Sequence, residues 1–248
     1  MRLKNTLPVV LLAAALAACG GDDTRYVERD VPAPVEYMPV DGFVLGFWVM
    51  EEQENCDSPC IDDASAYGDA LYVLDSAGEP VAPALEDGGA VGRVAVFDGD
   101  TRFATRATSA LNNTVIGERF SLHLRARTDQ ADTGPVVSLA SANGTALTVT
   151  LSNDRLLVDL PAQSQRMLTS LESGGGWREI QLASDGERVT LAVDCDVVAA
   201  FGAEPGVPVL STDALGVSVG GEGDAYFSGA VDLVRLSRQH EGNLFCEE

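Results

Sequence analysis

Basic residues are scarce in this chain, and lysine is almost absent. Among 248 residues, 16 are Lys or Arg and 38 are Asp or Glu, and Lys4 is the only lysine. The formal net charge of −22 argues against nucleic-acid binding, because phosphate contacts need clustered cations. By the same argument, heparin-like polyanions are not expected as partners. In its simplest interpretation, the charge keeps the protein soluble.

Aromatic residues and histidines are also few. Aromatic residues make up 6% of the chain and there are two histidines, His123 and His240, which lie far apart in sequence. Carbohydrate recognition commonly uses exposed aromatic faces, so the residues alone give it little support. No Gly-x-Ser-x-Gly, phosphate-cradling or zinc-binding pattern is present. We therefore expect a protein that is not an enzyme.

No apolar run is long enough to span a bilayer, which needs about 20 residues. The run Leu7–Ala18 is shorter and follows the basic residues Arg2 and Lys4. This arrangement is typical of a secretory signal, so residues 1–18 are predicted to be a signal peptide. The polar, proline-bearing stretch 19–40 then predicts a flexible tether, and 41–248 a single domain.

The end of the signal, Leu16-Ala17-Ala18-Cys19, resembles the lipobox of bacterial lipoproteins. In that family the chain is cut before the cysteine, whose thiol receives a diacylglycerol and whose new amino group receives a fatty acid such as palmitate. The resemblance implies lipidation of Cys19 and anchoring of the chain to a membrane of the cell envelope. Gly20 after the cysteine is similar to outer-membrane sorting in Gram-negative lineages. An ordinary signal peptide that carries a cysteine by chance is the alternative.

Alternating apolar residues predict many short strands. In the stretch 120–127 one parity holds Phe120, Leu122, Leu124 and Ala126, and the other holds His123 with polar neighbours. This pattern predicts a strand with one buried face and one solvated face, with His123 on the solvated face.

Further runs with strand character are separated by turn signals at Asn143-Gly144, Asn153-Asp154 and Asp185-Gly186. These runs are 136–140, 147–151, 156–159, 177–183, 188–194, 215–219 and 227–236. No window shows helical periodicity over 11 residues or more. The sequence therefore predicts an all-β, antiparallel, two-sheet jelly-roll sandwich.

Four cysteines remain after Cys19, an even number that indicates disulfides in an exported protein. Cys56 and Cys60 flank a proline turn and are expected to pair, with half of a metal site as the alternative. Cys195 is predicted to lie in a strand, with Asp194 and Asp196 on the opposite face. Three side chains so placed cannot converge on one ion, and an exported thiol is expected to be paired.

Five stretches in order resemble bacterial laminin-G-like jelly-roll domains of the concanavalin A-like superfamily. They are GFVLGFWVMEE, DDASAYGDALYVL, GRVAVFDGD, WREIQLASDGERVTLAVD and ALGVSVGGEGDAYFSGAVDLVRLSR. The resemblance covers about Gly42 to Arg238 and implies that Trp48 and Trp177 occupy core positions. The VDC motif is also similar to thrombospondin N-terminal relatives, which implies a disulfide from Cys195 to Cys246.

The family also implies calcium at the rim of the sandwich, held by oxygen ligands from two loops. Asp213 matches the second loop. In the first loop Thr145 stands where an aspartate is expected, preceded by Asn143 and Gly144. The candidate calcium ligands are therefore Asp213 and Asn143. A solvated acidic loop is the alternative interpretation, and a separate structural ion near Asp232 is another arrangement that the resemblance allows.

The resemblance implies a non-catalytic recognition or adhesion module for a protein or a glycan. Some relatives cleave glycans with the string Glu-x-Asp-x-x-Glu, in which two carboxylates share one strand face. Glu222-Gly223-Asp224 begins like that string, but Phe227 stands where the second glutamate would be. A glycan hydrolase with another carboxylate pair and a passive structural envelope lipoprotein are the alternative functions.

Overall fold

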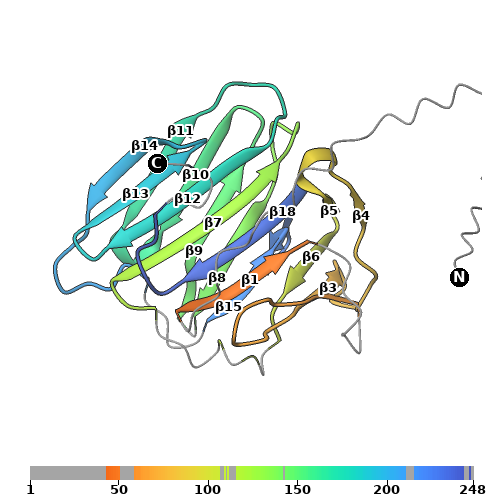
Figure 1. Ribbon diagram of the computed structural model, residues 1–248, viewed down its shortest axis with the longest axis horizontal. Helices are drawn as coiled ribbons and strands as arrows, with labels where there is room; N and C mark the ends of the chain where they lie inside the picture. Colours follow the sequence, from red (N-terminus) through yellow and green to blue (C-terminus); the bar gives the residue numbers. More distant parts are fainter. Residues whose placement is uncertain are drawn as a thin grey trace, which may run out of the picture. The chain divides into compact units, whose positions relative to one another are not determined.

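Short strands pair into two stacked antiparallel sheets, as Figure 1 shows. The computed structural model describes residues 43–50, 59–106, 109, 111, 116–141, 143–210, 215–242 and 246. All of them fall in one compact unit, Glu36–Glu248. The predicted signal peptide, the tether and the boundary at residue 40 lie outside the described residues. Within the described part, no helix is long and apolar enough to cross a membrane.

Sheet A forms one layer, and its two longest strands lie side by side in the middle. Its path is β14 (Asp196–Gly202), β13 (Arg188–Val193), β12 (Arg178–Asp185), β7 (Arg119–Arg127), β18 (Ser228–Ser237), β5 (Arg93–Asp98) and β4 (Leu85–Asp87). A further strand, β1 (Val44–Val49), pairs with the second half of β18, while β5 pairs with its first half. The C-terminal half of β18 is therefore flanked by β7 and β1.

Sheet B forms the other layer. Its order is β11 (Gln165–Ser170), β10 (Arg155–Leu160), β9 (Gly144–Leu151), β8 (Pro135–Ser141), β15 (Gly216–Val219), β6 (Thr101–Ala104), β3 (Leu71–Asp75) and β2 (Cys60–Ile61). A small hairpin joins β16 (Gly221–Glu222) to β17 (Ala225–Tyr226), and two 3-10 turns, η1 (Gly89–Val91) and η3 (Pro161–Gln163), complete the described elements. The all-β, antiparallel, two-sheet sandwich predicted from the sequence is confirmed.

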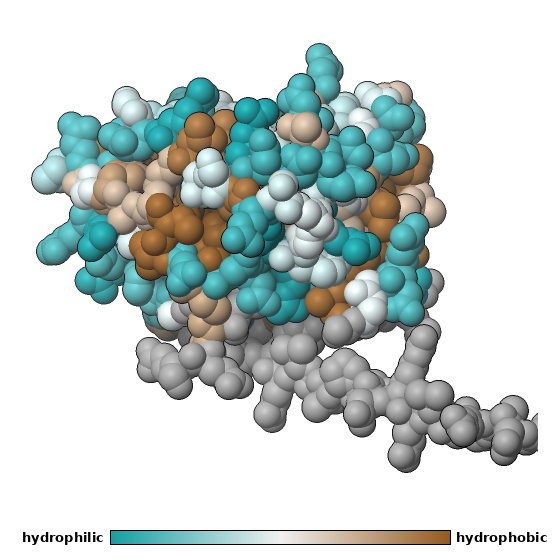
Figure 2. Space-filling model, turned by 90° about the horizontal axis from the view of Figure 1, so that it is seen from above, coloured by the Kyte–Doolittle hydropathy of each residue, from teal (hydrophilic) through white to brown (hydrophobic). Residues whose placement is uncertain are grey.

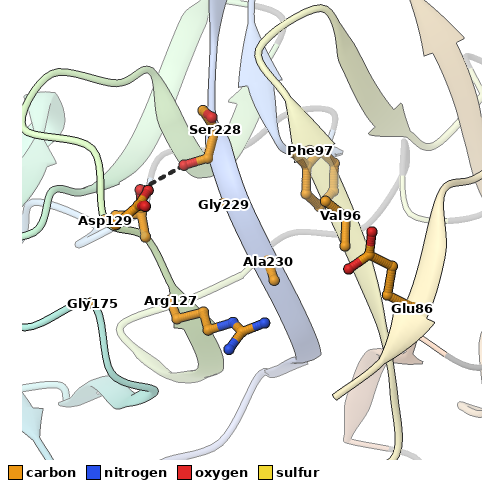
Figure 3. Close-up of a pocket in the computed structure, with 10 residues that line it drawn as sticks. Glu86, Val96, Phe97, Arg127, Asp129, Gly175, Ser228, Gly229 and Ala230 are labelled. Atoms are coloured by element: carbon orange, nitrogen blue, oxygen red, sulfur yellow. Dashed lines mark hydrogen bonds between the residues drawn. The ribbon is translucent and has the colours of Figure 1, made fainter.

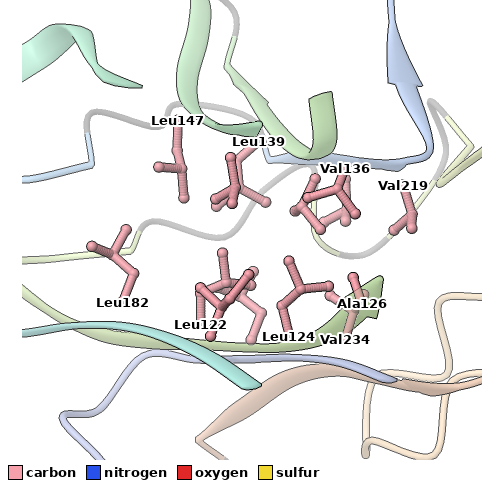
Figure 4. Packing of buried hydrophobic residues seen from close by; sticks show 14 of the residues in the cluster. Leu122, Leu124, Ala126, Val136, Leu139, Leu147, Leu182, Val219 and Val234 are labelled. Atoms are coloured by element: carbon pink, nitrogen blue, oxygen red, sulfur yellow. The ribbon is translucent and has the colours of Figure 1, made fainter. Parts of the chain in front are cut away.

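The core lies between the two sheets. Figure 4 shows Leu122, Leu124 and Ala126 of β7 facing Leu139 and Leu147 of sheet B. All five side chains are at most 2% exposed. Their alternation along β7 and along 147–151 is the one that the sequence predicts, because side chains on a strand point to opposite faces in turn. Trp48 of β1 also lies in the core, where its indole N–H donates to the Asp69 carbonyl at 2.9 Å.

The predicted hairpin at Asp185-Gly186 is confirmed, since β12 and β13 pair on either side of it. Gly186 has φ of 97°, a conformation that favours glycine. The Asp185 carboxylate accepts the N–H groups of Glu187 and Arg188, both at 2.8 Å. These hydrogen bonds hold the pKa of the Asp185 carboxyl below its usual value.

The prediction that Cys195 lies inside a strand is wrong. Asp194 and Cys195 form the two-residue turn between β13 and β14, with φ of 49° and 73°. Two consecutive positive φ angles are the geometry of the tightest hairpin turns, which match the twist of the strands they join. Apolar residues on both sides of the turn continue the alternation across it, which is why the pattern suggested one strand.

The second face of β7 is also not as predicted. Ser121 and His123 point away from the core, yet both are fully buried. His123 was expected on a solvated strand face. It is covered because the chain after β18 crosses this face of sheet A, as the contacts below show.

Candidate functional site

The outer face of sheet A, which points away from the core, is covered at one end by the C-terminal segment, defined here as described residues 238–242 and 246. The Glu241 N–H donates to the Ser121 hydroxyl at 2.8 Å, and its carbonyl accepts from the Gln181 amide at 3.0 Å. Its carboxylate accepts two hydrogen bonds from the Arg235 guanidinium, at 3.1 and 2.9 Å. Glu241 therefore binds to three neighbouring strands: β7, β12 and β18.

A disulfide fixes the far end of the C-terminal segment. Cys246 is bonded to Cys195 in the β13–β14 turn, with Cα atoms 5.7 Å apart. The segment thus runs from the end of β18 across the sheet to its edge hairpin. This is the pairing that the thrombospondin-like resemblance implied. Cys60 is also disulfide-bonded, whereas Cys56 lies outside the described residues.

His123 lies beneath this segment, with its Nδ1 atom 3.8 Å from the Glu241 carboxylate. The pKa of His123 is lowered to about 4, first because burial disfavours the charged imidazole. The carboxylate of Glu241 and the Gly242 backbone raise this pKa, while the positive charge of Arg235 lowers it. His123 is consequently neutral at neutral pH.

This burial predicts a pH dependence of stability. An unfolded histidine has a pKa near 6.5, so below that pH the unfolded chain binds a proton that the folded chain takes up only near pH 4. The free energy of unfolding should therefore fall by about 3 kcal/mol as the pH drops from 6.5 to 4. Urea unfolding across this pH range measures it.

The comparison with a variant isolates the contribution of His123 from that of the carboxylates. His123→Gln should flatten this part of the profile. Equal slopes in wild type and His123→Gln would contradict the assignment.

Arg125 forms two ion pairs in the middle of the same face. Its guanidinium donates to the Glu179 carboxylate at 2.8 Å and to the Asp232 carboxylate at 3.1 Å. Asp232, which was considered as a ligand of a structural ion, is buried at 4% exposure and serves as an ion-pair partner of Arg125. Among the described residues, no group of three or more His, Cys, Asp or Glu could hold a metal ion.

At the other end of the outer face of sheet A, the described residues leave a recess. A hollow of about 410 Å³ lies there between β4, β5, β18, the end of β7 and the loop before β12. Its floor is apolar and comes from Val96 and Ala230, and Gly175 forms part of one wall. We call this space the Arg127 hollow, after the cation in its wall.

Charged groups lie on opposite sides of the Arg127 hollow. Figure 3 shows the Arg127 guanidinium reaching from β7 toward Ala230, with Glu86 on the β4 side and Asp129 across from it. The Thr128 hydroxyl donates to the Ser228 carbonyl at 2.6 Å, which ties the end of β7 to β18. A volume of about 410 Å³ falls in the range of about 300–1,000 Å³ common for small-molecule sites.

Trp177 lies beside this hollow rather than in the core. The Arg127 guanidinium carbon is 5.0 Å from the centre of its ring, and the side chain is only partly buried. The core position implied for Trp177 by the laminin-G resemblance is therefore wrong, whereas that of Trp48 is confirmed. The three glycines at 174–176, before Trp177, were the sequence signal for a loop that lies close to another part of the chain.

A smaller hollow of about 180 Å³ lies on the outer face of sheet B. Several of its polar groups already bond to one another, although Arg102 Nε has no partner in the described structure: the Glu222 carboxylate accepts from the Ser138 hydroxyl at 3.0 Å and also from Thr145. Arg102 donates to the Gly223 carbonyl at 3.3 Å. A ligand here would have to displace internal hydrogen bonds, so the Arg127 hollow is the better candidate site.

The remaining sequence candidates are not brought together in the described structure. Asn143 lies exposed in the turn between β8 and β9. Thr145, which replaces the expected aspartate, bonds to Glu222 instead. Asp213 and Cys19 lie outside the described residues, so the calcium pair and the lipidation site stay predictions.

No large apolar docking face is seen on the described part of the chain. Its exposed large apolar side chains are Phe43, Leu168, Val197 and Val198. In the view of Figure 2, apolar residues form separate patches between hydrophilic ones.

Comparisons with known proteins support the fold. No family model matches the sequence, and no curated protein matches it. Domain 4 of AbnA, an extracellular arabinanase from Geobacillus stearothermophilus solved with arabinotriose, has a TM-score of 0.58 at 15% identity, covering 82% of this chain and 95% of that domain.

Toxin domains are similar to a comparable degree. The binding domain of Botulinum neurotoxin DC in complex with rat synaptotagmin II has a TM-score of 0.56 at 7% identity over 81% of this chain. The binding domain of Paraclostridial Mosquitocidal Protein 1 has a TM-score of 0.56 at 10% identity. This chain spans about half the length of those toxin chains. The comparisons define the chain as a β-sandwich of the architecture found in these carbohydrate- and receptor-binding domains.

Proposed function

We propose that this chain is a lipoprotein of the cell envelope whose laminin-G-like sandwich is a non-catalytic recognition module, with the Arg127 hollow as its binding site. The observation that carries the proposal is that the two ends of the outer face of sheet A differ. The C-terminal segment covers one end, and at the other end lies a hollow with an apolar floor and charged walls. Anchoring through Cys19 would hold such a module at the membrane, with the outer membrane favoured in a Gram-negative lineage.

The structural neighbours add support of a general kind. One was solved with arabinotriose and another with the protein rat synaptotagmin II, so this architecture serves both kinds of ligand. We favour a glycan, because the hollow is small and combines an apolar floor with charged walls, and the exposed large apolar side chains of the described part are few. A carboxylate on each side of the hollow, Glu86 and Asp129, is the one observation that favours a glycan hydrolase instead.

The test uses the full chain with Cys19→Ser. This variant is expected in the soluble fraction while the wild type stays with membranes, which checks the anchor and supplies the protein. On a glycan array it should bind at least one glycan class without releasing reducing sugar. Adding Ala230→Phe, which places a ring in the hollow, should weaken that binding at least tenfold.

The matched control is Ala200→Phe, an exposed position on β14 of the same sheet, which should bind as tightly as the parent. Binding of no glycan, or binding that Ala230→Phe leaves unchanged, would contradict the proposed site. Release of sugar that is lost in Glu86→Gln would replace the recognition module with a hydrolase.

A further inference from the structure

We propose that the Arg127 hollow recognises a sugar unit that carries a single carboxylate, such as a hexuronate within an otherwise neutral glycan. This inference rests on the proposed function and specifies its ligand. Three features carry it: a guanidinium that forms no ion pair with a described residue, an apolar floor beside it, and hydrogen-bonding groups at the rim.

The first feature is the state of Arg127. Its neighbours on the same sheet face, Arg125 and Arg235, are both held by carboxylates. Within the described part of the chain, the contact of the Arg127 guanidinium is with the Trp177 ring at 5.0 Å, and it forms no ion pair. What distinguishes Arg127 from other arginines of the described structure that form no ion pair is its place in the wall of a hollow, against an aromatic ring.

Trp177 also orients this cation. A guanidinium held against an aromatic ring keeps its planar set of N–H donors in one direction, and this geometry matches the two oxygens of a carboxylate. Figure 3 shows the Arg127 group directed across the floor of the hollow toward Ala230. A carboxylate bound there would lie above the apolar floor rather than out in solvent.

The floor suits the C–H face of a sugar ring. Val96 and Ala230 are register partners on β5 and β18, and Ala230 also pairs with Arg127 on β7. Gly229 lets β18 lie close to the end of β7 here, because a Cβ at this position would lie 2.3 Å from the Arg127 carbonyl oxygen. Apolar side chains from two neighbouring strands therefore lie next to the cation of the third.

The rim provides partners for hydroxyl groups and limits the charge of the ligand. Glu86, Asp129 and Ser228 all border the hollow and can accept hydrogen bonds from sugar hydroxyls. The same two carboxylates and the net charge of −22 repel a polyanion. One isolated carboxylate at Arg127 fits these constraints, and a heavily sulfated or phosphorylated chain does not.

The experiment uses the two tryptophans of the chain as reporters. The indole N–H signals of the ¹⁵N-labelled Cys19→Ser protein are followed while sodium D-glucuronate, D-glucuronamide or sodium acetate is added. Glucuronate should shift the Trp177 signal saturably and leave the buried Trp48 signal in place. Glucuronamide, which replaces the carboxylate by an amide, and acetate, which lacks the sugar ring, should each bind at least tenfold more weakly.

Arg127→Gln should abolish the glucuronate shift, and Arg188→Gln, which removes an exposed arginine elsewhere on sheet A, should preserve it. Equal affinity for glucuronate and glucuronamide, an unchanged shift in Arg127→Gln, or acetate as strong as glucuronate would overturn the inference. A neutral glycan whose array binding is lost in Ala230→Phe would also overturn it while leaving the proposed recognition function in place. If no glycan on the array were bound, both the inference and the proposed recognition function would be overturned.

Discussion

Loss of the Cys195–Cys246 disulfide is expected to lower the free energy of unfolding by about 4 kcal/mol. The bond closes a loop of 51 residues, and an open chain has more unfolded conformations to lose on folding. Cys246→Ser removes the bond without touching the β13–β14 turn. Urea unfolding of this variant and of the wild type under oxidising conditions measures the difference.

Variants of Cys195 separate the stabilisation by the disulfide from the cost of the backbone conformation in the turn. Cys195 has φ of 73°, a region that costs a residue with a side chain about 1–2 kcal/mol relative to glycine. With Cys246→Ser in both, Cys195→Gly should therefore be about 1 kcal/mol more stable than Cys195→Ser. If the two variants were equally stable, the turn would carry no backbone cost. If Cys246→Ser were as stable as wild type, the C-terminal segment would be held without the bond.

The sheet pattern could be predicted because it depends on neighbours in sequence. Phe120 and Leu122 alternate with polar residues, and the inward parity of β7 follows from that alone. The β12–β13 hairpin could be predicted for a similar reason, since Asp185 and Gly186 favour a tight turn wherever they occur.

The cover over the outer face of sheet A could not be predicted in this way. His123 looked solvated because its local neighbours are polar, yet residues about 120 positions away cover it, as the hydrogen bond from Glu241 to Ser121 shows. Local periodicity distinguishes the two faces of a strand but does not show whether a distant segment returns to one of them. The cysteine pair was the only sequence feature that linked the two regions.

The Arg127 hollow was missed for the same physical reason. Arg127, Glu86 and Ser228 belong to three strands that lie far apart in the chain and become neighbours only through the order of sheet A. The resemblance implied a core position for Trp177 from the strand motif that begins there, without the loop before it. The glycines at 174–176 were the local indication that the chain there comes close to another element.

Removal of the Glu241 carboxylate is expected to destabilise the protein by about 3–5 kcal/mol, because it leaves the buried Arg235 charge without its partner. Arg235 is 4% exposed and donates to both Glu241 carboxylate oxygens. Glu241→Met keeps the length of the side chain, and it keeps the backbone hydrogen bonds to Ser121 and Gln181. Urea unfolding at pH 7 measures the change, with His123 neutral in both proteins.

A double variant that also replaces Arg235 shows whether the lost stability comes from the uncompensated charge or from lost packing. Arg235→Met combined with Glu241→Met removes both charges, and this double variant should be clearly more stable than Glu241→Met alone. The surface pair Arg166–Asp159 is the matched control: its nitrogen and oxygen are 2.8 Å apart, close to the 2.9 Å of Arg235–Glu241, but Arg166 is 67% exposed. Asp159→Asn should therefore cost less than about 1 kcal/mol. A Glu241→Met effect as small as that would show that water reaches Arg235, and that the C-terminal segment does not seal this face of the sheet.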